Sequence, residues 1–238
     1  MSEATDLLKG NFLLDSIPRP DLALLATHLE WTDLVTHDVL HSANKPTNYL
    51  YFPISGICSI LAIGNDGKRI ETGIIGKEGL VGVSLCLSVE DAPFHVVVQI
   101  PGRSMRIAEH HFMPIFNSSV DMRKVILRFA YSFLVQTSQT VLANGRMTIQ
   151  QRLARWLLMC QDRVEMPEFV MTHQFLSDML AVRRSGITVA LQVLEDRKAI
   201  QSKRGKVRIL NRTLLKQMAG SAYGVAEKEY QRVLGSKK

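Results

Sequence analysis

Two adjacent arginines and two hydroxyl residues open a helix that the sequence predicts in the C-terminal third of the chain. Arg183, Arg184, Ser185 and Thr188 fall on the outward face of this helix, which we expect from about Arg183 to Arg197. Arginine is the commonest reader of guanine, because its planar fork donates two hydrogen bonds to one base edge. Hydroxyl groups and helix N-termini can also hold phosphates. The chemistry that this cluster predicts is contact with nucleic acid.

A second basic cluster follows about twenty residues later. Residues 199–202 and 207–210 are short apolar-polar runs, and they flank Lys203, Arg204, Gly205 and Lys206. This pattern predicts a two-stranded wing with a basic tip, and three cations on one tight turn suit a phosphate backbone. Either cluster alone could be an ordinary solvated surface. The two basic clusters follow closely in the sequence, and together they favour DNA binding.

The apolar spacing around these residues predicts the elements that position them. Thr172 is a plausible N-cap for a helix over residues 173–180, and Ala181-Val182 makes a tight turn before the second helix. His173 and Gln174 begin the first helix, where a phosphate contact is expected. This is the helix-turn-helix pattern, with inward apolar or small residues on both helices. These inward residues are Leu176, Ser177, Leu180, Ile187, Ala190, Leu191 and Leu194.

The charge distribution agrees with a polyanion partner for one part of the chain. The 238 residues carry a net charge of +7. Residues 147–238 hold 17 Lys and Arg against 8 Asp and Glu, whereas residues 1–146 hold 12 against 14. The basic excess therefore lies entirely in the C-terminal part.

The N-terminal half predicts a different architecture. Residues 5–31 indicate short helical pieces, one of them capped by Asp21 and running through Leu22, Leu25 and Leu29. From about Val35 to Ile107, short apolar runs alternate with turns, and residues 64–67 predict a hairpin. Such spacing is typical of a small sandwich or barrel-like roll. The expected strands are Tyr49–Phe52 (ended by Pro53), Ile57–Ile63, Arg69–Ile75 and Phe94–Ile100.

From His110 onward the period becomes helical, with apolar residues on two faces. One stripe recurs every seven residues, and a second contains Met122, Ile126, Phe129 and Phe133. A helix with two apolar faces predicts that one packs on its own β-domain and the other on a partner chain, although burial within one chain is the alternative. The predicted dimer seam is Val120, Leu127, Leu134 and Val141.

We expect Asn144-Gly145 to end this helix and to form the domain hinge. Thr148 can then cap a further helix that closes before Pro167. The predicted fold is α+β, with an antiparallel, jelly-roll-like β-roll as sensor domain (1–117), a dimerisation helix (118–145) and a winged helix-turn-helix (146–238).

The remaining motifs favour neither an enzyme nor a metal site. The sequence has no GxSxG, P-loop, HExxH or paired-carboxylate setting. His37 and His41 are four residues apart, but they fall where we expect strand or loop. Three dispersed cysteines, the lack of a signal-peptide pattern and the lack of a long apolar run favour a reduced, cytoplasmic chain that does not engage a membrane.

Together with the segment YFPISGICSILAIGNDGKRIETGIIGKEGLVG, residues 51–82, these features resemble the Crp–Fnr family of bacterial transcription regulators. The resemblance implies a homodimer whose β-roll senses a signal and positions two reading helices on a palindromic operator in double-stranded DNA, with RNA polymerase as a further partner. The half-sites of such dimers lie ~34 Å apart. Arg184 matches a reading arginine of the family. Ser185 and Val189 stand where the family often has a glutamate and a second arginine.

The ligand site matches the family less well. Gly82 is followed by Val83 instead of the glutamate that holds the ribose, and Ala92-Pro93 stands where an arginine and a hydroxyl hold the phosphate. Thr137-Ser138 matches the pair that contacts the base in some members, although close helix packing explains it equally well. The resemblance therefore assigns no cofactor, and cyclic AMP is not expected to bind tightly. A cyclic-nucleotide response through an atypical pocket, haem-type sensing and a ligand-independent regulator remain alternatives.

Overall fold

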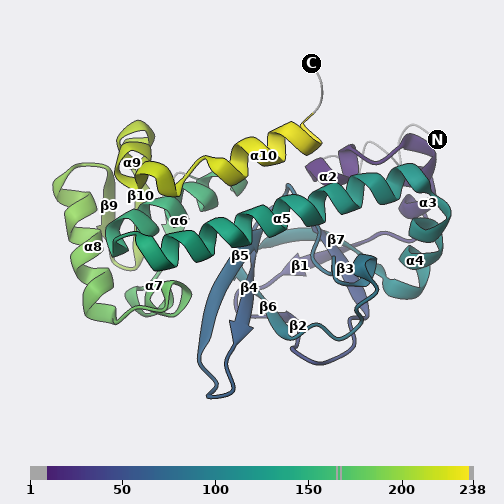
Figure 1. Cartoon of the computed structure of the whole chain (residues 1–238), viewed down its shortest axis with the longest axis horizontal. Coiled ribbons are helices and arrows are strands. Elements are labelled where there is room, and N and C mark those ends of the chain that lie inside the picture. The colour runs from purple at the N-terminus through teal and green to yellow at the C-terminus, as the bar shows by residue number, and fades with distance from the viewer. Residues whose placement is uncertain (1–9, 165, 167, 236–238) are drawn as a thin grey trace.

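The computed structural model describes residues 10–164, 166 and 168–235 of the chain. A long helix, α5 (Val120–Arg146), runs along the molecule between its other parts (Figure 1). The β-sheets lie on one side of α5, and the C-terminal domain lies at its C-terminal end. The last helix, α10 (Val225–Leu234), lies alongside it. The predicted helix end at Pro167 and the first residues of the predicted N-terminal helical pieces fall outside the described ranges.

The N-terminal domain is a roll of two antiparallel sheets, as the sequence predicts. One sheet has the strand order β2-β6-β4-β5 and the other β1-β7-β3. Leu50 and Phe52 from one sheet share an apolar core with Ile60 and Val96 from the other. The strands are β1 (Glu30–Leu34), β2 (Val39–His41), β3 (Tyr49–Pro53), β4 (Ile57–Ile63), β5 (Arg69–Ile75), β6 (Phe94–Ile100) and β7 (Gly102–Ala108).

The predicted hairpin between β4 and β5 is confirmed. Gly64 N donates to Lys68 O at 2.8 Å, and Gly67 adopts a positive φ of 75°. This hairpin matters for the rest of the molecule because β5 is the last strand of its sheet and faces the C-terminal domain. Within the described residues, the N-terminal domain is completed by four short helical segments, namely α2 (Phe12–Asp15), α3 (Arg19–Ala26), η1 (Leu85–Leu87) and α4 (Glu109–Ser118).

Two predictions for the N-terminal domain are wrong. Asp21 does not cap a helix, because α3 begins two residues earlier at Arg19, where Pro18 and Pro20 favour the first turn. The Asp21 carboxylate instead accepts from Ser119 Oγ at 2.7 Å, which joins α3 to the start of α5. Leu29 lies beyond the end of α3, and the next residue already belongs to β1, within the segment predicted as helical.

The C-terminal domain is a winged helix-turn-helix. Its first helix starts at the predicted cap, where Gln151 N donates to Thr148 Oγ1 at 3.3 Å and Thr148 N donates to Gln151 Oε1 at 3.0 Å. The wing has a third strand, β8, that the sequence did not predict. The elements are α6 (Ile149–Arg163), β8 (Glu168–Val170), α7 (His173–Leu180), α8 (Arg184–Asp196), β9 (Ile200–Lys203), β10 (Lys206–Ile209), α9 (Arg212–Ala219) and η2 (Gly220–Ala222).

The predicted break at Asn144-Gly145 is also wrong. Helix α5 continues through both residues to Arg146, and the chain turns at Met147, whose backbone is extended. A glycine inside a helix costs only about 1 kcal/mol, so α5 can continue through Gly145. The capping box at Thr148 has a non-helical N-cap residue that starts a new helix, so the helix break falls beside Thr148.

The apolar core of the C-terminal domain extends onto one sheet of the β-roll. Ile57, Leu61 and Ile74 of the β4–β5 hairpin belong to the same buried cluster as Leu157 and Leu158 of α6. The C-terminal domain therefore packs directly on the β-roll as well as on α5.

Candidate DNA-binding interface and sensor site

The helix-turn-helix forms as its apolar spacing predicts. Thr172 Oγ1 accepts from Phe175 N at 3.1 Å and caps α7. Ala181 takes a left-handed backbone conformation in the turn, and Ser177 Oγ donates to Val182 O at 2.5 Å. The inward residues of α8 are all buried, and this fixes which face of the helix looks outward. They are Ile187, Ala190, Leu191 and Leu194.

The outward face of α8 carries the predicted reading residues. Arg183 is the N-cap residue, and Arg184, Ser185 and Thr188 follow on the first turns, all of them exposed. Thr188 Oγ1 lies 3.0 Å from His173 Nδ1, so the hydroxyl ties the reading helix to the first residue of α7. The structure therefore brings the predicted residues of both helices together on one exposed surface. Such a surface matches the donor geometry of major-groove readout.

The wing places its cations at the edge of that domain. Arg204 and Gly205 form the turn, both with positive φ, and Lys203 and Lys206 pair opposite each other as the last and first residues of β9 and β10. Lys206 Nζ lies 3.0 Å from Glu168 Oε1 on β8. The hydrogen bond from Lys206, together with the neighbouring Arg208, holds the pKa of the Glu168 carboxyl below its ordinary value. A phosphate that binds Lys206 must therefore compete with Glu168.

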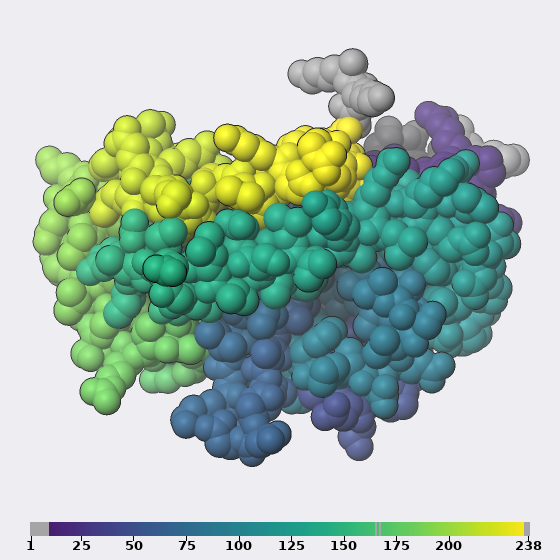
Figure 2. Space-filling model, in the orientation of Figure 1, coloured from purple at the N-terminus to yellow at the C-terminus, as the bar shows by residue number. Residues whose placement is uncertain are grey.

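The heptad stripe on α5 is exposed in the single chain. Leu134 is 62% exposed and Val141 is 67% exposed, and Val120 and Leu127 also lie at the surface. The opposite stripe packs on the β-roll, where Met122, Ile126 and Phe129 are buried. Helix α10 packs on a further side of α5, and Figure 2 shows it lying along that helix. Apolar side chains that recur every seven residues and are left open by all of the chain's described elements are typical of a helix–helix interface between chains.

The predicted ligand residues lie on two separate elements. Gly82 adopts φ 99° and is backed by His41 and Leu50, and Val83 packs partly buried against the apolar core of the roll. Burial lowers the pKa of His41, whose Nε2 lies 2.8 Å from Tyr49 O. Thr137 and Ser138 lie on α5, and Ser138 Oγ donates to Leu134 O of its own helix at 2.9 Å. The contacts of these four residues do not join them into one site.

The segment around Ala92-Pro93, where the family resemblance places the phosphate, is acidic. The sequence holds neither lysine nor arginine between Lys77 and Arg103. Glu90 and Asp91 stand exposed directly before Ala92, which is buried, and Thr47 N donates to Glu90 O at 2.9 Å. A phosphate here would meet carboxylates instead of a cation.

A buried carboxyl group, which the sequence analysis missed, connects the two domains. Glu71 on β5 is 6% exposed, and its Oε1 accepts from Trp156 Nε1 on α6 at 2.7 Å. Its Oε2 accepts from Ser59 Oγ at 2.7 Å and from Gln99 Nε2 at 3.2 Å. Burial raises the pKa of Glu71 to about 7, although these donors oppose the rise. The only sign of this buried carboxyl group in the sequence was a charged residue, Glu71, within a strand that ends in apolar residues.

Gln136 makes a second connection, from α5 to the same strand. Its Oε1 accepts from Ile74 N at 2.8 Å, and its Nε2 donates to Ile74 O at 3.2 Å. The side chain thus extends the ladder at the edge of β5. Arg155 of α6 donates to Thr140 Oγ1 on α5 at 3.2 Å, so that β5, α5 and α6 are linked pairwise by buried polar contacts.

Comparison with known proteins agrees with this architecture. Residues 32–119 match the model of the cyclic nucleotide-binding domain, and residues 151–218 match that of the Crp-like helix-turn-helix domain. The chain belongs to the Crp/Fnr family of transcription regulators. No curated protein matches its sequence. The family consists of DNA-binding regulators and not of enzymes, as the sequence analysis predicted.

Solved structures share the fold of this Crp/Fnr protein at low sequence identity. FixK2 from Bradyrhizobium japonicum is 16% identical, with a TM-score of 0.70 over 82% of this chain and 99% of that one. A Crp/Fnr-family regulator from Eubacterium rectale is also 16% identical, with a TM-score of 0.69 over 88% and 98% of the two chains. A regulator of the same family from Thermus thermophilus is 18% identical, with a TM-score of 0.65 over 82% and 100%.

Proposed function

We propose that this Crp/Fnr regulator is a homodimer that reads a palindromic operator by placing two α8 helices in successive major grooves. The observation that carries the proposal is the exposed row of Arg183, Arg184, Ser185 and Thr188 at the start of a helix whose other face is fully buried. Arg184 reads guanine, and the wing cations hold the backbone. Val189 is 57% exposed on this face and offers only apolar contact, so its base preference differs from that of an arginine.

The open stripe on α5 supports the dimer. Val120, Leu127, Leu134 and Val141 form a seam with a spacing of seven residues, which a second copy of α5 can cover in a parallel coiled coil. Two copies related by a two-fold axis present two reading helices, and this symmetry requires a palindromic site. In this proposal the protein acts in the cytoplasm. Once it is bound to the operator, it contacts RNA polymerase.

We further propose that cyclic AMP is not the signal. Val83 replaces a ribose-binding carboxylate with an apolar side chain, and Glu90 and Asp91 place negative charge beside the expected phosphate. An anion brought into such a site without a cation pays a desolvation cost of several kcal/mol. Calorimetric binding of cyclic AMP at micromolar affinity or tighter would contradict this part of the proposal.

Titration of a labelled random duplex pool with the full chain, repeated over a range of salt concentrations, tests the DNA-binding function. We expect binding that weakens steeply with salt, because each neutralised phosphate releases counterions. Binding that is absent at low salt would refute the function. Binding that does not respond to salt would refute the electrostatic role of the wing.

A further inference from the structure

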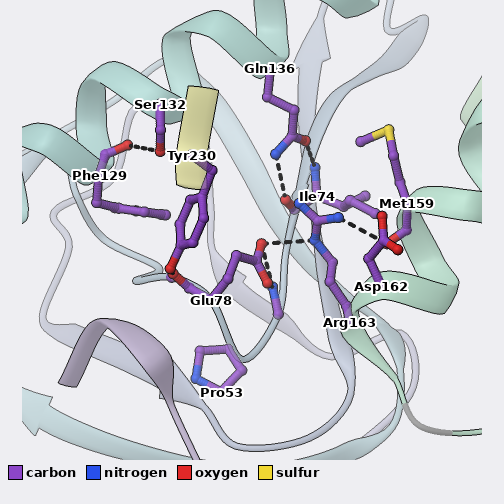
Figure 3. Close-up of polar contacts among 12 residues, drawn as sticks. Pro53, Ile74, Glu78, Phe129, Ser132, Gln136, Met159, Asp162, Arg163 and Tyr230 are labelled. Carbon is purple, nitrogen blue, oxygen red and sulfur yellow. Dashed lines mark hydrogen bonds and ion pairs between the residues drawn. The ribbon is translucent and has the colours of Figure 1, made fainter. Parts of the chain in front are cut away.

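A cavity of about 330 Å³ lies where the β-roll, α5, the end of α6 and the C-terminal helix meet. It is distinct from the Gly82–Val83 region, since no residue of that region lines it. The volume is at the lower end of the range for small-molecule sites, which is ~300–1000 Å³. Figure 3 shows part of its walls, with Phe129 and Tyr230 on one side, Gln136 and Arg163 on the other and Glu78 between them.

Aromatic side chains form much of the wall. Phe129 and Phe133 project from α5 with ring centroids 6.5 Å apart, and Tyr230 faces the cavity from α10. The hydroxyl of Tyr230 donates to Glu78 O at 2.8 Å, which fixes the ring between the C-terminal helix and the β-roll. Phe129 is buried, whereas the partly buried rings of Phe133 and Tyr230 offer flat apolar surface to a planar ligand and negative π faces to a cation.

The charged lining is acidic on balance. Among the described residues, Glu78, Asp162 and Glu227 line the cavity together with one cation, Arg163. Arg163 pairs with Glu78, because its Nε donates to Glu78 Oε1 at 2.7 Å. Asp162 is engaged as well, since it pairs with Arg212 and accepts from the hydroxyl of Tyr223 at 2.6 Å. Glu227 accepts from Gly224 N at 2.9 Å and is the lining carboxylate for which the described residues show no arginine partner, which favours a positively charged ligand and disfavours an anion.

We propose that this cavity binds an aromatic small molecule that carries a cationic amine. The ring lies against Phe133 and Tyr230, and the amine donates to Glu227. The walls belong to the sensor domain, the dimerisation helix and the C-terminal domain. A bound ligand therefore contacts all the parts whose relative placement determines the positions of the two α8 helices in the dimer. The idea that the cavity receives a regulatory signal rests on the proposed regulator function. Ligand binding in the cavity does not depend on that function.

Two matched probes test the ligand chemistry on the full chain without DNA. Tryptamine has an aromatic ring and an ammonium, and indole-3-acetate pairs the same ring with a carboxylate. Calorimetry or ligand-observed NMR should give tryptamine a dissociation constant below roughly 1 mM, as expected for a ligand of about a dozen non-hydrogen atoms. Indole-3-acetate should bind at least about tenfold more weakly. Equal affinities, or no tryptamine binding at 1 mM, would overturn the proposal.

Variants on α10 locate the site. Ala226 lines the cavity and is 7% exposed, so Ala226→Trp should fill the space and abolish tryptamine binding. Val225→Trp is the matched control, because Val225 is 50% exposed on the same helix and does not line the cavity. Glu227→Gln keeps the shape and an acceptor for Gly224 N, and should weaken tryptamine roughly three- to tenfold.

The variants also separate this inference from the regulator function. Tryptamine binding that survives both Ala226→Trp and Glu227→Gln would overturn the site, whether or not the chain binds DNA. Should Ala226→Trp fail to fold, Glu227→Gln decides the matter alone. A chain that binds tryptamine through this cavity but does not bind duplex DNA would support the site and refute the proposed function.

Discussion

The buried carboxyl group of Glu71 makes the stability of the protein depend on pH near neutrality. Glu71 lies between the β-roll and α6, and its pKa is raised to about 7 by burial, from an ordinary value of 4.5. The folded protein therefore holds a proton that the unfolded chain releases above pH 4.5. Since the native state binds more protons in this window, the free energy of unfolding falls as the pH rises from 4.5 to about 7, and the loss is complete above pH 7.

The two pKa values set the size of the effect. A difference of this size corresponds to about 3 kcal/mol, most of which falls between pH 5 and pH 8. Glu71→Gln removes the titration. Its amide oxygen can keep the hydrogen bond from Trp156 Nε1. The amide of Gln99, whose buried Oε1 has no hydrogen-bond partner among the described residues, can rotate to accept from the new NH₂ group.

Urea unfolding followed by circular dichroism at pH 5 and pH 8 measures the effect on both proteins. The wild-type protein should lose roughly 2–3 kcal/mol more than Glu71→Gln between these pH values. Trp156→Phe deletes one donor to the carboxylate, so the step in its stability should move to higher pH. Parallel pH profiles for the wild-type protein and Glu71→Gln would refute the reasoning, because all other titrating groups are shared.

Three further predictions concern the DNA and dimer surfaces. Arg184→Ala should cost roughly 1–3 kcal/mol at one base pair per half-site and relax the preference there, measured by anisotropy on operator variants. Lys206→Ala should weaken binding to all sequences alike and lower the slope of log affinity against log salt by about one. Leu134→Asp should yield monomers in sedimentation, because it buries an unpaired charge at the seam. An unchanged base preference in Arg184→Ala, an unchanged salt slope in Lys206→Ala or an intact dimer in Leu134→Asp would contradict the corresponding prediction.

The parts of the fold that local patterns determine could be predicted from the sequence. The helix-turn-helix needs only inward apolar residues at helical spacing and a cap at Thr172, and the hairpin at residues 64–67 needs only turn residues. The strands that escaped prediction carry weak signals. Strand β1 has Asp33 and Glu30 among few apolar residues, β2 and β8 have three residues each, and β7 contains two arginines.

The contacts between domains could not be predicted, because they join residues far apart in the chain. Trp156 and Glu71 are 85 positions apart, and Gln136 and Ile74 are 62 apart. The cavity has the same origin, since Tyr230 approaches Glu78 only after the C-terminal helix has folded back along α5. Gly79 permits part of this packing, because a Cβ there would come within 2.4 Å of the Phe129 ring.

Selection of bound duplexes from a random DNA library, at two salt concentrations, tests the central claim most directly. A dimer with two α8 helices predicts a two-fold symmetric motif whose half-sites are about 10–10.5 base pairs apart, centre to centre, or a multiple of that spacing. Arg184→Ala should lose one position in each half-site of the motif and keep the spacing. Enrichment of a single, unrepeated half-site, or of the same motif with and without Arg184, would contradict the account.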